Sequence, residues 1–278
     1  MEKIEIAREK IQNATAILIG AGAGLTDGAG LKHDGEEFKR DFADYISRYG
    51  FRDLYSAGFH PFPSQEEFWS FWARHAAFMG INPLALPLYA KLKQLVENKN
   101  YFVITTNVDR QFYKAGFGEE KIFAVQGDMS RIQCAKPCAH VVYEGREIFN
   151  TIIANSANLK ARTGDVPVCP SCGGPMTMHL RIDQNFVEDQ HWHEMEDNYK
   201  KFLARYSQKN LVMLEIGVGF NTPGIIRFPF EALAAASPNA VLIRINKNDE
   251  PMRYHELDNI ITFQEDAQKV ISELPISS

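Results

Sequence analysis

Near its N-terminus the chain reads Ala16-Ile17-Leu18-Ile19-Gly20-Ala21-Gly22-Ala23-Gly24. The first five residues form a short apolar run, which is typical of a parallel strand covered on both faces. Glycines follow at the place where an open α/β sheet presents its ligands. Glycine lets the backbone approach a phosphate group, and a following helix N-terminus supplies unpaired N–H groups. The stretch favours an α/β fold, and by itself it fits a nucleotide site and a tight strand-to-helix turn equally well.

Further apolar runs along the chain have the same character of buried strands. They are Tyr101–Thr105, Lys121–Val125, Leu211–Gly217, Ala240–Ile245 and Ile260–Phe263. Segments with helical periodicity, such as Leu84–Glu97 and Asp266–Leu274, separate most of these runs. Strands that alternate with helices predict a Rossmann-like, doubly wound parallel sheet.

Two long segments interrupt this alternation and predict a smaller inserted lobe. Residues 32–83 are rich in aromatic side chains and predict two or three helices joined by a turn at Gly58–Pro63. Residues 129–186 hold all four cysteines. We therefore expect a Rossmann-like domain of residues 1–31, 84–128 and 187–278, a helical insert of residues 32–83 and a metal-binding insert of residues 129–186.

The cysteines form two closely spaced pairs, Cys134-x-x-x-Cys138 and Cys169-x-x-Cys172. Zinc prefers four ligands in a tetrahedron, and two such pairs supply four thiolates. The sequence Cys169-Pro170-Ser171-Cys172-Gly173-Gly174 is typical of a zinc knuckle, because glycine permits the tight turn around the metal. The pairs predict a closed, structural zinc site, the alternative being four unrelated thiols.

The composition narrows the possible partners and the compartment. Hydrophobic residues make up 45% of the chain, which is enough to build a core without disulfides. The net charge is -5 and no long basic run is present, so we expect no nucleic-acid partner. No stretch approaches the roughly 18 apolar residues that span a bilayer, and the N-terminus lacks the pattern of a signal peptide. Four cysteines whose spacing suits metal ligation, in a chain without a recognisable export signal, favour a reducing compartment over disulfide formation. We therefore expect the protein in the cytoplasm, away from membranes.

Several polar motifs follow the predicted strands. Thr105-Thr106-Asn107-Val108-Asp109 follows the second strand, and Gln126-Gly127 precedes the cysteines. Leu180-Arg181-Ile182-Asp183-Gln184-Asn185-Phe186, Gly217-Val218-Gly219 and Asn246 come after them. In this order, around a cysteine quartet, the motifs resemble the sirtuin family across nearly the whole chain.

The resemblance implies NAD as co-substrate and a cleft between a Rossmann-like domain and a zinc lobe. It implies that Asn107 orients the nicotinamide ribose and that Asp109 holds the nicotinamide amide; with Gln126 they are the predicted catalytic residues. A strand-end Asx turn is the structural alternative for the first two, and a plain turn is the alternative for Asn246. The predicted cofactor-binding residues are Gly20, Ala21, Gly22, Ala23, Thr26, Asp27, Asn107, Asp109, Gln126, Gly217, Gly219 and Asn246.

The chain departs from the usual sirtuin pattern at several positions. Gln126 stands where sirtuins have histidine, and Thr106 where they have glutamine. Lys32-His33-Asp34 replaces an Asp-Phe-Arg segment, and Val187-Glu188-Asp189 lacks a recognisable acyl-lysine clamp. These departures resemble the sirtuin branch found beside macrodomain proteins in bacteria and fungi. That resemblance implies ADP-ribosylation of a lipoylated, glycine-cleavage-H-like carrier protein, a macrodomain hydrolase as functional partner, and a role in oxidative stress.

The identity of residue 126 bears directly on the chemistry. Deacylation by a sirtuin needs a base that deprotonates a ribose hydroxyl, and a glutamine amide takes no proton near neutral pH. Transfer of ADP-ribose to a protein side chain lacks that step. Gln126 therefore favours an NAD-dependent protein ADP-ribosyltransferase. An NAD-dependent deacylase, an NAD glycohydrolase and a non-catalytic NAD-sensing module are the alternatives.

Three further features have weaker interpretations. His191 and His193 are spaced i, i+2 and point apart on a helix, so we expect a surface or packing role. The aromatic stretch Phe68–Phe78 is expected in a packed core, with the lining of an acceptor channel as the alternative. His33 lies in the loop where an active site is expected, and its role stays open.

Overall fold

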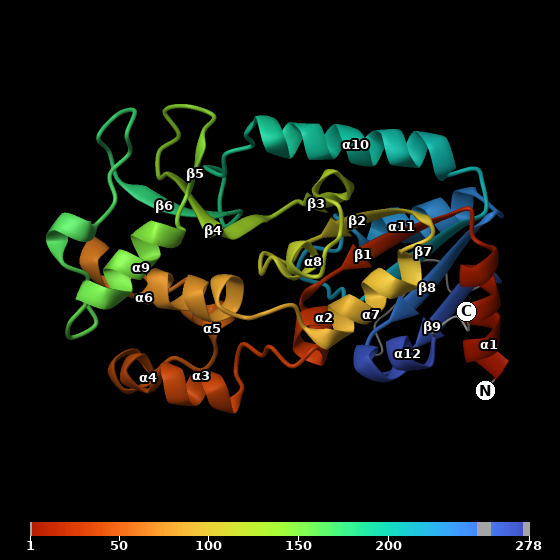
Figure 1. Cartoon of the computed structure of the whole chain (residues 1–278), viewed down its shortest axis with the longest axis horizontal. Coiled ribbons are helices and arrows are strands. Elements are labelled where there is room, and N and C mark those ends of the chain that lie inside the picture. Colours follow the sequence, from red (N-terminus) through yellow and green to blue (C-terminus); the bar gives the residue numbers. More distant parts are fainter. Residues whose placement is uncertain (1, 249–256, 275–278) are drawn as a thin grey trace.

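The computed structural model describes residues 2–248 and 257–274. Its centre is a six-stranded sheet in the order β3-β2-β1-β7-β8-β9 (Figure 1). Every neighbouring pair in this sheet is parallel, which confirms the predicted Rossmann-like sheet. The strands are β1 (Ala16–Ala21), β2 (Asn100–Thr105), β3 (Ile122–Ala124), β7 (Leu211–Ile216), β8 (Ala240–Ile245) and β9 (Ile260–Phe263).

Helices cover both faces of the sheet, which is why the central strands are apolar on both sides. One face packs against α1 (Glu2–Asn13), α7 (Pro87–Val96), α8 (Gln111–Lys114) and α12 (Ala267–Glu273). The other face packs against α10 (Gln190–Tyr206) and α11 (Arg227–Ala236). The short helix α2 (Ala23–Gly28) follows the central strand β1, and the 3-10 turn η2 (Glu119–Lys121) precedes the edge strand β3. Among the described helices, none is both long and apolar enough to cross a membrane.

A second, antiparallel sheet forms part of the inserted lobe, at the left of Figure 1. Its order is β5-β4-β6, with β4 (Gly127–Cys134), β5 (Val142–Glu144) and β6 (Met176–Leu180). The helix α9 (Arg146–Asn155) and the 3-10 turn η3 (Thr163–Asp165) lie between β5 and β6 in the chain. This antiparallel sheet was absent from the sequence-based expectation.

The rest of the lobe is helical and shares one core with that sheet. It contains α3 (Glu36–Asp41), α4 (Ala43–Tyr49), α5 (Leu54–Ala57), α6 (Gln65–His75) and the π-helix η1 (Ala76–Ile81), more helices than the two or three predicted. Ser64 caps α6 by accepting a hydrogen bond from Glu67 N at 3.2 Å. Trp69 of α6 is fully buried and stacks on Phe149 of α9. Two segments far apart in the sequence thus bury a common apolar face, and neither has a separate core.

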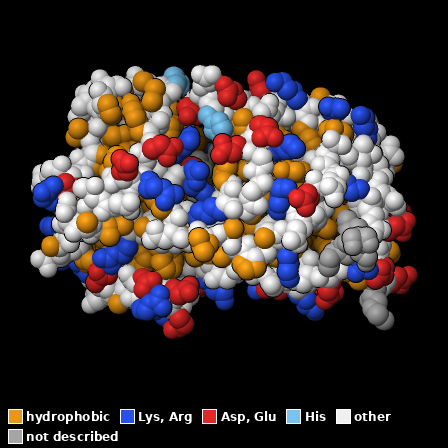
Figure 2. All heavy atoms as spheres, viewed as in Figure 1, with side chains coloured by type: hydrophobic (Ala, Val, Ile, Leu, Met, Phe, Trp, Pro, Cys, Tyr) orange, Lys and Arg blue, Asp and Glu red, His pale blue; other side chains and the backbone are white. Residues whose placement is uncertain are grey.

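The surface carries charges of both signs. Figure 2 shows Lys and Arg side chains interspersed with Asp and Glu over the face in view. Opposite charges at short range screen one another, so this face has no extended field of one sign.

Candidate active site and zinc centre

A cavity of roughly 500 Å³ lies where the carboxyl ends of β1, β2 and β7 meet the inserted lobe. Parallel α/β sheets place ligands at this edge. Ten of the predicted site residues line it: Gly22, Ala23, Thr26, Asp27, Asn107, Asp109, Gln126, Gly217, Gly219 and Asn246. Gly20 and Ala21 lie within β1 and are not among the lining residues, whereas Gly24, which was not predicted, is one of them.

The glycines at this edge have a packing role that the sequence alone did not reveal. A Cβ on Gly20 would lie 2.5 Å from Ile226 Cγ2, so the start of helix α11 can pack this closely on β1 only because residue 20 is glycine. A Cβ on Gly22 would lie 2.6 Å from Gly217 O, and one on Gly217 would lie 2.2 Å from Leu25 N. The β1–α2 turn therefore packs backbone to backbone on the loop after β7. Gly219, by contrast, faces open space, where a ligand can approach.

A buried polar network at the cavity floor joins the β1–α2 turn, the loop after β2 and helix α7. Thr26 Oγ1 donates to Asp109 Oδ2 at 2.5 Å and lies 2.8 Å from the Tyr89 hydroxyl. Asn107 Nδ2 donates to Gly22 O and to Thr26 Oγ1, both at 3.0 Å. One donated and two accepted bonds use the full capacity of a hydroxyl group. The network fixes the orientation of Asn107 and Asp109 without any bound ligand.

Asp109 is held in an environment that disfavours its charge. Its side chain is buried, and this burial raises the pKa of its carboxyl group, while the bond from Thr26 and the backbone N–H of Gln111 act in the opposite direction. A perturbed acid in a cavity is typical of a functional site.

Gln126 lines the same cavity, immediately before β4. The next residue, Gly127, has φ 100°, and a Cβ there would lie 2.1 Å from His179 O. Only glycine fits this backbone. A turn at residues 125–126 leads into β4, and Gln126 O accepts a bond from Arg181 N at 3.0 Å, so the turn and this bond set the position of the glutamine.

Two polar pairs border the cavity. His33 Nδ1 lies 3.5 Å from Asp27 Oδ1, and both residues line the cavity. Asn246 Nδ2 donates to Val218 O at 3.0 Å and so holds the glycine loop after β7. The structure thus brings His33, whose role the sequence left open, to the same cavity as Asn107 and Asp109.

The lobe contributes one wall of the cavity. Trp72 and His75 of α6 and Met79 of η1 line the cavity, and all three side chains are buried. Burial lowers the pKa of His75 to about 3, and the charge of His33 is a second, smaller cause. The Phe68–Phe78 stretch is therefore packed core, as expected, with one face open to the cavity.

The four cysteines converge on one point at the far side of the lobe. All four sulfur atoms lie within 4.8 Å of one another, with Cys134 Sγ 3.8 Å from Cys172 Sγ and Cys138 Sγ 3.6 Å from Cys169 Sγ. Tetrahedral zinc with bonds of about 2.3 Å to sulfur requires sulfur atoms about 3.8 Å apart. The cluster therefore fits the predicted zinc site.

The chain around Cys169 is shaped for this cluster. Gly173 adopts φ 70°, which glycine tolerates best, and its N–H donates to Cys169 O at 2.8 Å. The backbone N–H of Cys172 lowers the pKa of the Cys169 thiol to about 6. A thiolate is the form that binds zinc, so the turn favours ligation by Cys169, whereas the neighbouring thiols of Cys172 and Cys169 raise the pKa of Cys138 to about 12.

Comparison with known proteins identifies the family to which the chain belongs. No protein-family profile matches the chain. It is 33% identical over 250 residues to a protein ADP-ribosyltransferase of Staphylococcus aureus, covering 88% of this chain and 78% of that one. The chain belongs to this protein ADP-ribosyltransferase family. A probable bifunctional ADP-ribose hydrolase/ADP-ribosyltransferase of Fusarium oxysporum is 32% identical over 260 residues, which are 90% of this chain and 43% of that protein.

Solved structures assign the fold of this ADP-ribosyltransferase family member. A Sir2 homologue in complex with NAD superposes with a TM-score of 0.62 at 14% identity, over 97% of this chain and 91% of the other. A mutant Sir2 homologue in complex with 2′-O-acetyl-ADP-ribose gives 0.64 at 15% identity, over 97% and 94%. The chain therefore has the sirtuin fold, as its motifs indicated.

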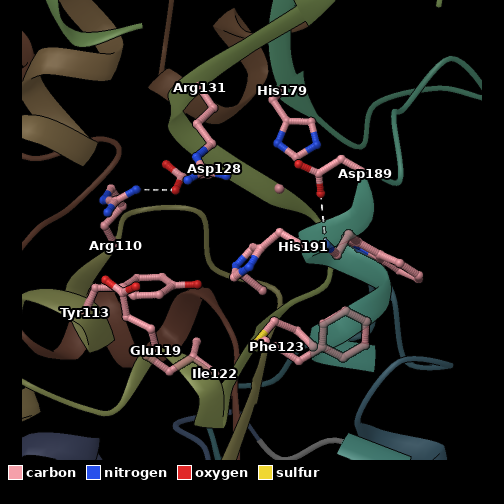
Figure 3. A pocket seen from close by; sticks show the side chains of 14 residues that line it. Arg110, Tyr113, Glu119, Ile122, Phe123, Asp128, Arg131, His179, Asp189 and His191 are labelled. Carbon is pink, nitrogen blue, oxygen red and sulfur yellow. Dashed lines mark hydrogen bonds and ion pairs between the residues drawn. The ribbon is translucent and has the colours of Figure 1, made fainter. Parts of the chain in front are cut away.

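A second, smaller cavity of roughly 180 Å³ lies behind the turn at Gln126. Figure 3 shows Arg110 and Asp128, which form an ion pair, on one side of it and Asp189 and His191 on the other. Arg110 follows Asp109 and Asp128 follows Gly127, so this pair ties together the two loops that carry Asp109 and Gln126. In this ADP-ribosyltransferase the helix position of His191 is therefore close to the back of the candidate site.

Proposed function

We propose that this chain is an NAD-dependent protein ADP-ribosyltransferase that releases nicotinamide and modifies a lipoylated, glycine-cleavage-H-like carrier protein. The observation that carries the proposal is the amide of Gln126 in the same cavity as Asn107 and Asp109. Membership of the protein ADP-ribosyltransferase family supports the same activity.

In the proposed reaction the bond between ribose C1′ and the nicotinamide nitrogen breaks, and the electron pair leaves with nicotinamide. Asn107 orients the ribose and Asp109 holds the carboxamide, both fixed by Thr26. The acceptor nucleophile then forms a bond to C1′ and loses its proton to solvent water. Developing positive charge on the ribose is stabilised by preorganised dipoles, among them the side-chain oxygens of these residues.

Gln126 determines which second step is fast. A general base typically contributes about 100- to 10,000-fold to a proton transfer, and an amide does not supply it. The Gln126 amide hydrogen-bonds ribose hydroxyls and leaves C1′ open to an external nucleophile. The deacylase route is therefore the slower one on this scaffold.

Water is the competing nucleophile, and one observation favours it. His33 and Asp27 form a histidine–carboxylate pair in the cavity, an arrangement that deprotonates water or a side chain. NAD glycohydrolase activity in the absence of acceptor is therefore the second candidate function.

A macrodomain-type ADP-ribose hydrolase is the proposed functional partner. The support is the name of the Fusarium oxysporum relative, which joins hydrolase and transferase activities in one protein. An enzyme that removes ADP-ribose makes the modification reversible.

Intact-mass spectrometry tests the proposal. The full chain is incubated with NAD and, in parallel, with a lipoylated carrier protein, the same carrier without lipoyl, and an acetylated peptide. We expect the lipoylated carrier to gain the mass of NAD less nicotinamide, and the peptide to stay acetylated. Rapid formation of O-acetyl-ADP-ribose with an unmodified carrier would return this protein to the deacylases. Gln126→His tests whether a restored base raises deacylation, with its melting temperature measured alongside wild type.

A further inference from the structure

Four charged side chains lie buried between the parallel sheet and helix α11. They are Glu215 of β7, Arg244 of β8, and Arg227 and Glu231 of α11, and none of them is more than 4% exposed. Charged groups lose their hydration in a protein interior, so they are retained there when they are paired with one another. We call these four residues the buried quartet.

Short ion pairs bind the quartet together. Glu215 and Arg244 are opposite one another in the register of β7 and β8, and they form a bidentate pair with Nε–Oε1 at 2.7 Å and Nη2–Oε2 at 2.9 Å. Arg244 Nη1 also lies 2.7 Å from Glu231 Oε1. Arg227 lies near the same two carboxylates, 3.6 Å from Glu215 and 3.9 Å from Glu231. Each carboxylate therefore faces both guanidinium groups, and this arrangement holds the guanidinium group of Arg227 in place.

A further contact of Arg227 leads to the active-site cavity. Its Nη1 donates to the backbone oxygen of Val218 at 3.3 Å, and its guanidinium group lies over the ring of Phe220 at 4.7 Å. The same oxygen of Val218 accepts from Asn246 Nδ2 at 3.0 Å. A carbonyl oxygen has two lone pairs, so the two donors use its full capacity. Because Arg227 is fully buried, the carbonyl group of Val218 is fixed toward the protein interior.

The loop after β7 is held at its first two residues and open at the third. Gly217 N donates to Ile245 O at 2.9 Å, and Gly217 O accepts from Gly24 N at 3.0 Å. Gly219 is exposed, lines the cavity and has open space where a Cβ would stand. The fixed carbonyl group of Val218 therefore sets the direction in which the backbone of Gly219 meets a ligand.

Stability alone does not explain why charged residues occupy this place. Replacing a buried ion pair by well-packed apolar residues of similar volume is often neutral or stabilising, because the desolvation cost of the charges disappears. An apolar side chain at position 227 would fill the same space, yet it would leave the oxygen of Val218 with one donor fewer. What the charged quartet supplies is a rigid hydrogen-bond donor directed at a loop of the cavity.

We propose that Arg227 is a positioning residue, which fixes the loop of residues 217–219 for contact with the ADP-ribose portion of NAD. The inference rests on the proposed function, in which the nicotinamide portion belongs to Asn107 and Asp109. Those two residues are fixed by separate hydrogen bonds with Thr26 and Gly22. Arg227 should therefore act on cofactor binding and leave the breaking of the nicotinamide–ribose bond unchanged.

The test variant is Arg227→Met/Glu231→Met. It removes one positive and one negative charge and leaves the bidentate Glu215–Arg244 pair, so its urea midpoint should stay close to that of wild type. The full, zinc-loaded chain is titrated with ADP-ribose by isothermal titration calorimetry, and nicotinamide release from NAD is followed without acceptor. ADP-ribose should bind about tenfold more weakly, and KM for NAD should rise about tenfold, whereas kcat should stay within about twofold of wild type.

Arg227→Lys separates the bond to Val218 from the charge. Lysine carries the same charge, but its side chain is shorter than that of arginine and lacks the planar fork of donors. The variant keeps a cation beside the two carboxylates and should still bind ADP-ribose about tenfold more weakly than wild type. It decides the question if the double variant fails to fold, because wild-type affinity in Arg227→Lys would overturn the inference.

Arg48→Met/Glu67→Met is the matched control. Glu67 is a buried carboxylate of α6 that lies 3.5 Å from Arg48, and neither residue lines the cavity. This variant should bind ADP-ribose as wild type does, whatever its urea midpoint. Equal weakening in control and test variants would show that affinity merely follows stability, and would overturn the inference. So would wild-type ADP-ribose affinity in Arg227→Met/Glu231→Met, or a lower kcat at unchanged KM.

Neither measurement needs a protein acceptor, which separates this inference from the proposed function. Nicotinamide release without modification of any carrier would refute the proposed transferase and leave the role of Arg227 standing. Modification of the carrier together with unchanged ADP-ribose affinity in the Arg227 variants would refute the role of Arg227 alone.

Discussion

Replacing Thr26 by valine removes one hydroxyl group and leaves the shape of the side chain nearly unchanged. Three partners lose a bond: Asp109 at 2.5 Å, Tyr89 at 2.8 Å and Asn107 at 3.0 Å. Each partner keeps one other contact. Asp109 still accepts from Gln111 N, and Asn107 still donates to Gly22 O. The variant therefore weakens the network without dissolving it.

The expected loss of stability follows from the kinds of bond involved. A buried hydrogen bond to a carboxylate contributes about 1.5 to 3 kcal/mol, and a neutral one about 1 kcal/mol. The three bonds share one atom and are not additive, so we expect Thr26→Val to lower the free energy of unfolding by about 3 kcal/mol. Thr26→Ser keeps the hydroxyl and loses only a buried methyl group, about 1 kcal/mol.

Urea unfolding of the zinc-loaded chain measures the difference, with the midpoint read at unchanged m-value. Nicotinamide release from NAD is measured on the same samples. Thr26→Val should reduce it about 10- to 100-fold, because Asn107 and Asp109 lose their fixed orientation. If Thr26→Val is as stable and as active as Thr26→Ser, the network does not position these residues.

Three further outcomes are expected. Cys172→Ser should lose about one zinc per chain, as measured by elemental analysis, and should have a lower melting temperature, whereas Ser171→Ala should keep the metal. Loss of zinc at an unchanged melting temperature would contradict a structural role of the site. As pH falls below 6.5, His75 becomes protonated in the unfolded chain but stays neutral in the folded protein, so the free energy of unfolding of wild type should fall by up to about 1.4 kcal/mol per pH unit from this group. Urea midpoints at pH 7 and pH 5 should show that His75→Leu lacks this contribution. Equal pH dependence of the two proteins would contradict the assignment of a buried, neutral His75. Arg110→Gln should slow ADP-ribosyl transfer about tenfold, while NAD should still raise the melting temperature of the variant. Arg131→Gln is the control, because the partner of Arg131, Glu144, is exposed. A wild-type transfer rate in Arg110→Gln would show that the Arg110–Asp128 pair does not position the two loops.

The sequence predicted the parallel sheet well because its strands are buried on both faces. Such strands appear as continuous apolar runs, and β8 and β9 have the predicted bounds. The antiparallel sheet of the lobe lacks this signal. β5 has three residues, none of them buried, and the pairing of β4 with β6 shifts register between Gly127 and Ile132. A shifted, irregular strand does not alternate apolar and polar residues with period two.

The candidate site residues could be predicted only where a local sequence pattern marks them. Asn107 and Asp109 directly follow a predicted strand, and the spacing of the four cysteines predicts a zinc site. Trp72 and His75 are three residues apart in a helix in which Trp69 and Phe71 are also buried. Such a pattern predicts a core-facing helix. Which part of the aromatic face borders a cavity depends on β4 and β6, far away in sequence, and no local signal carries that information.

The two ends of the cavity are built from different parts of the chain, and the proposed cleavage of the nicotinamide–ribose bond involves residues of only one of them. Asn107 and Asp109 lie on the loop after β2, Thr26 lies in helix α2, and the three side chains form one hydrogen-bonded unit. Trp72 and His75 belong to the lobe, and Gln126 stands at the junction, immediately before β4. Substitutions on the sheet side should therefore change nicotinamide release and transfer together, because both begin at the same ribose carbon. The proposed function thus assigns cleavage of the nicotinamide bond to the sheet side of the cavity and the change in the second step to residue 126 at the junction.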